Sequence, residues 1–210
     1  GYKIAMRDLE IRGAGTMLGE AQSGHMEAVG YDLYCKMLNE AVQKLKGQDR
    51  GDTDSFATTI DLDVDAFIPG FYIVNEVQKL DIYKRIAGIE NEKERDDMKD
   101  ELLDRFGTVP KSVENLLEIA LIRVAAHKLF FTEIKGKNER IIFTFKPDAK
   151  INPAGIPALL QRAGRNLSFT AYGTPYLTYK YKKTGLVETD AELLLGQTRE
   201  ILGLMTELLR

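Results

Sequence analysis

The sequence lacks most of the residues from which compact metal sites and disulfide frameworks are built. Its 210 residues include one cysteine, Cys35, two histidines, His25 and His127, and no tryptophan. A single cysteine excludes an intrachain disulfide and a multi-cysteine zinc site, and it favours a reducing, cytoplasmic setting. The histidines lie far apart in sequence, so we interpret each as a helix or loop residue and Cys35 as a small buried hydrophobe.

Long hydrophobic runs and targeting signals are also missing. No apolar run approaches the roughly 18 to 20 residues of a membrane span, and no signal peptide opens the chain. The first residue is Gly1, and the sequence begins inside a helical pattern. We therefore expect the chain to be a fragment of a longer protein.

The chain has no excess of positive charge, and its charged residues are unevenly distributed along the sequence. The formal net charge is −3, which argues against a domain that holds nucleic acid through bulk positive charge alone. Residues 51–107 carry seven basic and fifteen acidic side chains, whereas residues 108–210 carry fifteen basic and ten acidic ones. Different parts of the chain are therefore expected to face different partners.

A nucleotide-binding loop is absent as well. Nothing matches G-x-x-x-x-G-K-[ST], whose lysine and hydroxyl must reach phosphate and magnesium together, so we expect no ATP site, no cofactor, no metal and no enzymatic activity in this fragment. Gly13, Gly15 and Gly19 imitate a dinucleotide fingerprint with the wrong final spacing and no preceding strand. These glycines are interpreted as loop geometry.

The first 50 residues contain two segments with a helical pattern. Residues 4–11 have a helical pattern that should stop at Gly13, glycines follow at 13, 15, 19 and 24, and residues 31–45 return apolar side chains at helical spacing. The polar segment 47–55 has no periodicity and is interpreted as a linker. We therefore predict two domains, residues 1–50 and residues 55–210.

The second domain alternates blocks of helices and strands. Ile60, Leu62 and Val64 alternate with aspartates, which predicts a half-buried strand running towards Pro69. Helices are expected over 76–89, 93–107, 111–129 and 191–209, with a short helix capped by Asn152. Strands are expected within 130–145, as a pair joined by a turn, and over 167–173 and 176–182. The predicted fold class is α+β: an N-terminal helical hairpin and loop, then a domain of helices and antiparallel strands.

Two clusters leave a functional alternative open. Asp61, Asp63 and Asp65 could offer a metal three carboxylates, but a solvated or edge-protecting strand face is the favoured interpretation. Four tyrosines interleave with three lysines near the end of the chain, which is typical of a stacking platform for single-stranded nucleic acid, although a β-hairpin with an amphipathic face is favoured. They are Tyr172, Tyr176, Tyr179, Tyr181, Lys180, Lys182 and Lys183.

The opening stretch and three later motifs resemble a known family. RDLEIRGAG, followed by LG and QSG, resembles the translocation motif of the RecG-like superfamily 2 DNA translocases. AFIP, LDIYKRIA and LLDRFGTVP resemble the C-terminal domain of the bacterial transcription-repair coupling factors (Mfd), so that the resemblance covers essentially the entire chain. In this family, Arg12 and Gln22 match the arginine and glutamine of the translocation motif at the same spacing.

The resemblance implies a role within a larger machine. Members of this family are ATP- and magnesium-dependent translocases on double-stranded DNA that displace stalled RNA polymerase. They recruit nucleotide excision repair through UvrA, its damage-recognition subunit. Residues 1–50 would end the second helicase lobe, with Arg12 and Gln22 coupling nucleotide-driven motion to DNA. Residues 55–210 would dock on the protein's own N-terminal region and mask its UvrA-binding surface. The alternative is an independent module that binds a protein or a nucleic acid.

Overall fold

The structure is a computed structural model that describes residues 56–210. The linker at 47–55 and the predicted features of residues 1–50, among them Arg12, Gln22, His25 and Cys35, lie outside the described residues and stay predictions. The described chain separates into two compact units. Within the described chain, unit 1 contains residues 56–57 and 65–120, and unit 2 contains residues 58–64 together with 121–210.

Unit 1 is built from helices with well-defined ends. They are α3 (Glu76–Ala87), α4 (Glu92–Phe106) and the first part of α5 (Lys111–Lys128). Asn75 and Asn91 cap α3 and α4, because their side chains accept hydrogen bonds from the backbone N–H groups of Gln78 and Glu94. Gly107, at a positive φ of 86°, ends α4 in a conformation that favours glycine. The three helices predicted for this region are confirmed.

The core of unit 1 follows from the helical spacing of its apolar residues. Ile82 and Ile86 of α3, Leu102 of α4 and Leu116 of α5 are fully buried. Residues four apart lie on one helical face, so Ile82 and Ile86 form one buried stripe, while most of the exposed residues of α3 are charged. Burying each such side chain stabilises the unit by about 1.5–3 kcal/mol.

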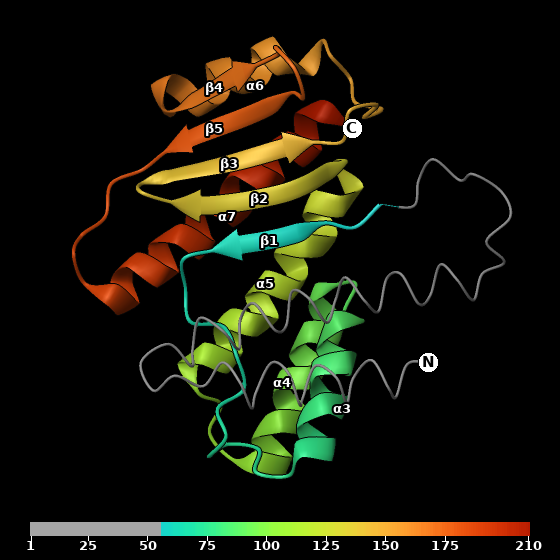
Figure 1. Ribbon diagram of the computed structural model, residues 1–210, viewed down its shortest axis with the longest axis vertical. Coiled ribbons are helices and arrows are strands. Elements are labelled where there is room, and N and C mark those ends of the chain that lie inside the picture. Colours follow the sequence, from blue (N-terminus) through green and yellow to red (C-terminus); the bar gives the residue numbers. More distant parts are fainter. Residues whose placement is uncertain (1–55) are drawn as a thin grey trace, which may run out of the picture. The chain divides into compact units, whose positions relative to one another are not determined.

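Unit 2 is a five-stranded sheet in the order β1-β2-β3-β5-β4 (Figure 1). Its strands are β1 (Thr59–Leu62), β2 (Phe131–Lys137), β3 (Arg140–Phe145), β4 (Leu167–Thr170) and β5 (Tyr176–Lys180). β1 pairs with β2 in parallel, and all other pairs are antiparallel. The predicted α+β fold is confirmed.

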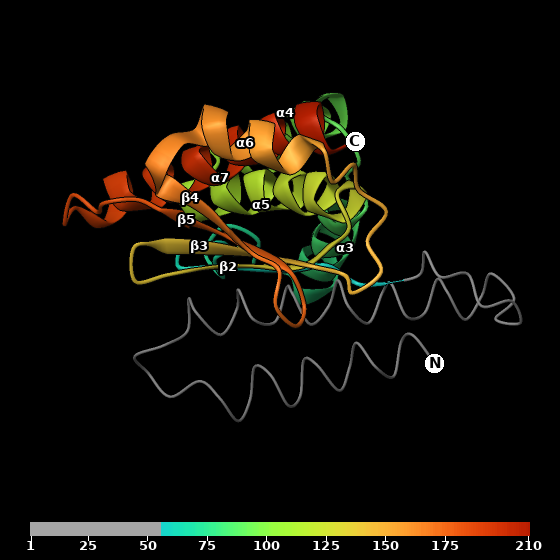
Figure 2. The ribbon, with the colours of Figure 1, turned by 90° about the horizontal axis from the view of Figure 1, so that it is seen from above.

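Helices cover one face of this sheet. Figure 2 shows α6 (Gly155–Ala163) and α7 (Val187–Leu209) on the same side of the strands. Most side chains directed to that side are buried, among them Ile134, Phe143 and Leu177, which are register partners across β2, β3 and β5. Because side chains alternate along a strand, the intervening residues lie on the opposite face.

Several predicted boundaries differ from the structure; the strands predicted over 167–173 and 176–182, for example, end at Thr170 and Lys180. β1 ends at Leu62, because Val64 N–H turns back to donate to the Leu62 carbonyl at 2.7 Å, and Asp63 and Val64 lie outside the strand. Asn152 does not cap the short helix as predicted: its side-chain oxygen accepts a hydrogen bond from the backbone N–H of Ala154 at 3.2 Å, and α6 begins at Gly155 without a side-chain cap. The last helix starts at Val187 rather than 191.

The early start of α7 has a local cause. The Asp190 carboxylate accepts hydrogen bonds from the backbone N–H groups of Thr184 and Gly185 and from the Thr184 hydroxyl. These bonds, led by that from the Thr184 backbone, lower the pKa of Asp190. They order the segment before the helix, so the first turn forms upstream of the apolar run.

Candidate functional site

The three later sequence motifs are held together inside unit 1. The backbone N–H of Ile68, in AFIP, donates to the hydroxyl of Tyr83, in LDIYKRIA, at 2.8 Å. The Tyr72 hydroxyl donates to the carbonyl oxygens of Leu102 (3.1 Å) and Gly107 (2.9 Å), both in LLDRFGTVP. These contacts fix the segment before α3 against the end of α4.

That fixed segment and the first turn of α3 present three large apolar side chains to solvent. Phe71, Val74 and Val77 are 79%, 78% and 76% exposed, and we call them the apolar patch. Between Phe71 and Val74, Tyr72 and Ile73 are buried, and the ring centroids of Tyr72 and Phe106 lie 5.8 Å apart. The patch is therefore displayed by an anchored segment rather than by a loose one.

Helix α4 gives the same unit an acidic surface. Unit 1 carries thirteen acidic and eight basic side chains over residues 65–120, a net charge of −5. The basic side chains of α4 are engaged: Arg95 contacts Glu118 at 2.5 Å, Lys99 contacts Glu114 at 3.1 Å, and Lys93 and Arg105 pair within the helix. Six of the seven carboxylate side chains of α4, all except Glu101, are exposed to solvent.

One carboxylate joins two helices of unit 1. Glu101 of α4 accepts hydrogen bonds from Arg85 of α3, one of them at 2.7 Å, and from Arg105 at 2.9 Å. The bond from Arg85 is the largest cause that lowers the pKa of Glu101 to about 2. Glu101 remains charged through the physiological range and belongs to the framework of the unit.

Two of the other sequence candidates, Asp63 and His127, make contacts within unit 2. Asp63 pairs with Lys183 at 3.5 Å, and His127 Nδ1 lies 3.1 Å from the Thr58 hydroxyl, which donates to the Phe131 carbonyl. No group of His, Cys, Asp and Glu among residues 56–210 is arranged to hold a metal ion. No helix of the described chain is long and apolar enough to cross a bilayer.

The tyrosines of the last hairpin do not form one platform. Tyr179 lies on the helix-covered face of the sheet and its hydroxyl contacts Gln197 of α7 at 2.9 Å, while Tyr181 is buried. Tyr176 alternates with these residues and lies on the opposite face, and Tyr172 is in the turn, 94% exposed. The β-hairpin interpretation is confirmed for β4 and β5, and the continuous stacking platform is not formed.

Sequence reasoning located the three motifs but missed the apolar patch. In the sequence, the segment FYIVNEV resembles any half-buried apolar stretch, because exposed and buried residues alternate irregularly in it. The signal that could have identified it is its place directly after Pro69 and Gly70 and before the helix cap Asn75, where regular structure is interrupted.

Comparison with known proteins agrees with these motifs. The TRCF domain family matches residues 62–156. Transcription-repair-coupling factors of Bacillus subtilis (strain 168) and Staphylococcus epidermidis (strain ATCC 12228 / FDA PCI 1200) are 44% and 42% identical over 149 and 167 residues, which cover 71% and 79% of this chain. The chain spans only 13% and 14% of the length of these relatives.

A solved structure extends the comparison to the fold. The crystal structure of the C-terminal domain of a transcription-repair coupling factor matches with a TM-score of 0.56 and 25% identity, over 72% of this chain and 96% of that one. The sequence relatives, the domain match and the shared fold point to one family. The chain belongs to the transcription-repair coupling factor family and includes its C-terminal domain.

Proposed function

We propose that the described domain is a regulatory clamp within a longer DNA translocase. In this proposal the domain docks on the N-terminal region of the same protein and masks the surface that UvrA binds, while the motor that uses ATP and magnesium on double-stranded DNA and acts on stalled RNA polymerase lies elsewhere in the parent. The translocation motif of Arg12 and Gln22 would couple that motor to DNA. The domain itself performs no reaction.

The observation that carries the clamp proposal is the apolar patch. Phe71, Val74 and Val77 are each more than three-quarters exposed although they lie on an anchored segment. Exposed apolar side chains that are held in place and rimmed by polar residues are typical of protein interfaces. Covering these three would remove enough apolar surface from water for a reversible contact.

The charge of unit 1 specifies the kind of surface that would cover the patch. The acidic side chains of α4 exceed the basic ones available to pair with them, so a partner surface with an apolar centre and a basic rim is the best complement. Such an interface is polar at its edge and opens without unfolding either side, as a reversible clamp requires.

The clamp is tested by mutating the patch in the full-length parent protein. Replacing Phe71, Val74 and Val77 together by serine should weaken the closed state and raise the affinity for UvrA by about tenfold or more, since 1.4 kcal/mol corresponds to tenfold. The control replaces three exposed apolar residues of unit 2, Tyr172, Leu186 and Val187, by serine. An unchanged UvrA affinity in a folded patch variant would remove the proposal.

The coupling role of the opening motif has its own test in the parent. Alanine at Arg12 or Gln22 should reduce DNA translocation more than ATP hydrolysis, because the ATP site lies elsewhere while the coupling contact is lost. Single-turnover translocation and steady-state ATPase assays on each variant measure the two activities. Equal loss of both would indicate general destabilisation instead of lost coupling.

A further inference from the structure

The sheet of unit 2 has one face that no described element of that unit covers. α6 and α7 lie on the other face (Figure 2). The uncovered face holds the residues that alternate with the buried ones, and many of them are polar or charged. They are Thr59, Asp61, Glu133, Lys135, Lys137, Arg140, Ile142, Thr144, Ser168, Thr170, Tyr176, Thr178 and Lys180.

Three cations form a row across this face. Lys137 of β2 is the register partner of Arg140 of β3, and Arg140 is the register partner of Lys180 of β5. All three side chains are exposed. The last residues of β2 and β5 and the first of β3 lie at the same end of the sheet (Figure 1), and we call these three residues the cation row.

Such an arrangement is unfavourable for the fold by itself. Like charges directly opposite each other on neighbouring strands destabilise a sheet. Elsewhere on the same face, residues of opposite charge lie opposite each other: Lys135 is the register partner of Asp61. For the cation row, no described residue forms an ion pair with any of the three side chains.

The carboxylates of the adjoining segments are engaged elsewhere. Asp63, directly after β1, contacts the Lys183 ammonium at 3.5 Å. Glu139, in the turn between β2 and β3, accepts a hydrogen bond from the Lys183 backbone N–H at 3.1 Å. Neither carboxylate forms an ion pair with the cation row.

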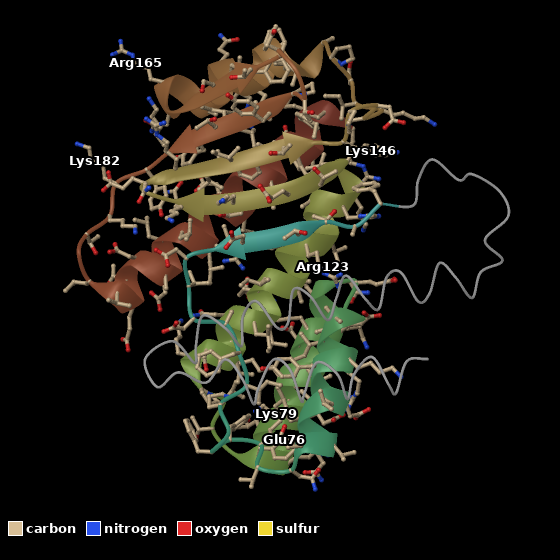
Figure 3. All side chains as sticks on the ribbon, in the orientation of Figure 1. Glu76, Lys79, Arg123, Lys146, Arg165 and Lys182 are labelled. Carbon is tan, nitrogen blue, oxygen red and sulfur yellow. The ribbon has the colours of Figure 1, made fainter. Side chains whose placement is uncertain are left out.

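More cations lie at the same end of the sheet. Figure 3 shows Lys182, two residues after β5, and Arg165, in the turn before β4, at the end where the cation row lies. Unit 2 as a whole carries fourteen basic and ten acidic side chains, a net charge of +4, although the complete chain is acidic. The cations at this end outnumber the nearby carboxylates of Asp63, Glu139 and Asp190, so an anion would relieve the repulsion.

We propose that the cation row binds the sugar-phosphate backbone of a nucleic acid. Neighbouring strands lie about 4.8 Å apart, so the row spans about 10 Å. Three successive phosphates of one DNA strand advance about 7 Å along the helix axis, a difference that flexible lysine and arginine side chains can bridge. Backbone binding does not require stacking, which agrees with the placement of Tyr179 on the covered face.

This site is separate from the proposed clamp. The cation row belongs to unit 2, whereas the apolar patch belongs to unit 1, and the two surfaces differ in charge and in polarity. A negative result for nucleic-acid binding would therefore leave the clamp proposal standing, and a negative result for the clamp would leave the nucleic-acid proposal standing.

The test measures binding of the full 210-residue chain to a fluorescent duplex of roughly 20 base pairs and to a single strand of the same length. Three phosphate contacts predict a slope of log K against log salt of about −2.7 for the duplex and about −2.1 for the single strand. Affinity for the duplex should then fall about 40-fold between about 50 and about 200 mM salt. The slope should not depend on base sequence.

The variant K137Q/R140Q/K180Q removes the row, and K84Q/K93Q/K150Q removes the same charge from exposed positions elsewhere. The row variant should lose at least about tenfold in affinity at low salt and nearly all of the salt slope, with Tm unchanged or raised because the like charges are gone. The control should keep both affinity and slope. Equal weakening in both variants, or no binding by the native chain at low salt, would overturn the proposal.

Discussion

Tyr72 anchors the apolar patch, and its hydroxyl is the part of the side chain that does so. The hydroxyl donates to the carbonyl oxygens of Leu102 and Gly107, where α4 ends. Tyr72→Phe should lower the free energy of unfolding by about 1–2 kcal/mol, because a buried hydrogen bond is lost and carbonyl groups are left unpaired. Urea unfolding measures the change. Tyr172→Phe, at an exposed position, is the control and should have no effect.

Glu101 gives unit 1 a specific sensitivity to acid. Its pKa is lowered to about 2 from an ordinary 4.5, so its contribution to stability is fully present above about pH 4.5 and is lost as the pH falls towards 2. Glu101→Gln should lower the free energy of unfolding by about 1 kcal/mol or less at pH 7, because the side chains of Arg85 and Glu101 are partly exposed and their interaction is screened by solvent. The difference between native chain and variant in urea titrations should then shrink as the pH falls from 4.5 to 2. A constant difference would contradict the ion-pair explanation.

At the scale of elements, the packing of α6 against α7 depends on one glycine. A Cβ at Gly155 would lie 1.9 Å from the backbone oxygen of Leu208, a contact that only movement of a helix could relieve. Gly155→Ala should therefore destabilise the chain by about 1–3 kcal/mol or more. Gly203→Ala in α7 is the matched control: a Cβ there meets nothing within 4 Å, and stability should rise by about 0.5–1 kcal/mol. Thermal or urea unfolding of the two variants distinguishes them, and equal effects would contradict this packing.

The helices and strands were predictable where their signals are local. Helical spacing with Gly107 after it located α4, and alternation around a turn located β2 and β3. The shortened β1 was not predictable, because its alternation continues through Val64 although the Val64 N–H turns back to Leu62. The early start of α7 depends on side-chain bonds of Asp190, which no periodicity encodes.

The two candidate surfaces were predictable to different degrees. The charge asymmetry of the sequence already separated an acidic half from a basic half, and the two units reproduce it. The cation row was not predictable, because Lys137, Arg140 and Lys180 become neighbours only through strand register. The apolar patch likewise depends on which residues of its segment the fold anchors, as Tyr72 shows.

For the whole molecule, we propose that the described domain restrains the parent protein. Unit 1 carries an apolar patch and a net negative charge, which suit a reversible intramolecular contact. If that contact favours the closed state by a few kcal/mol, the open state is rare until the domain is removed. The restraint should then affect every activity that needs the open state, including DNA-stimulated ATP hydrolysis by the parent.

The most direct measurement is a titration of UvrA against the full-length parent and against the parent truncated after about Gly47, at matched salt. Removing the domain should raise UvrA affinity by about tenfold for each 1.4 kcal/mol of closed-state stabilisation. Circular dichroism and unfolding curves establish that the truncated protein is folded. Equal affinities for UvrA in the two folded proteins would contradict the clamp and leave the domain without a regulatory role.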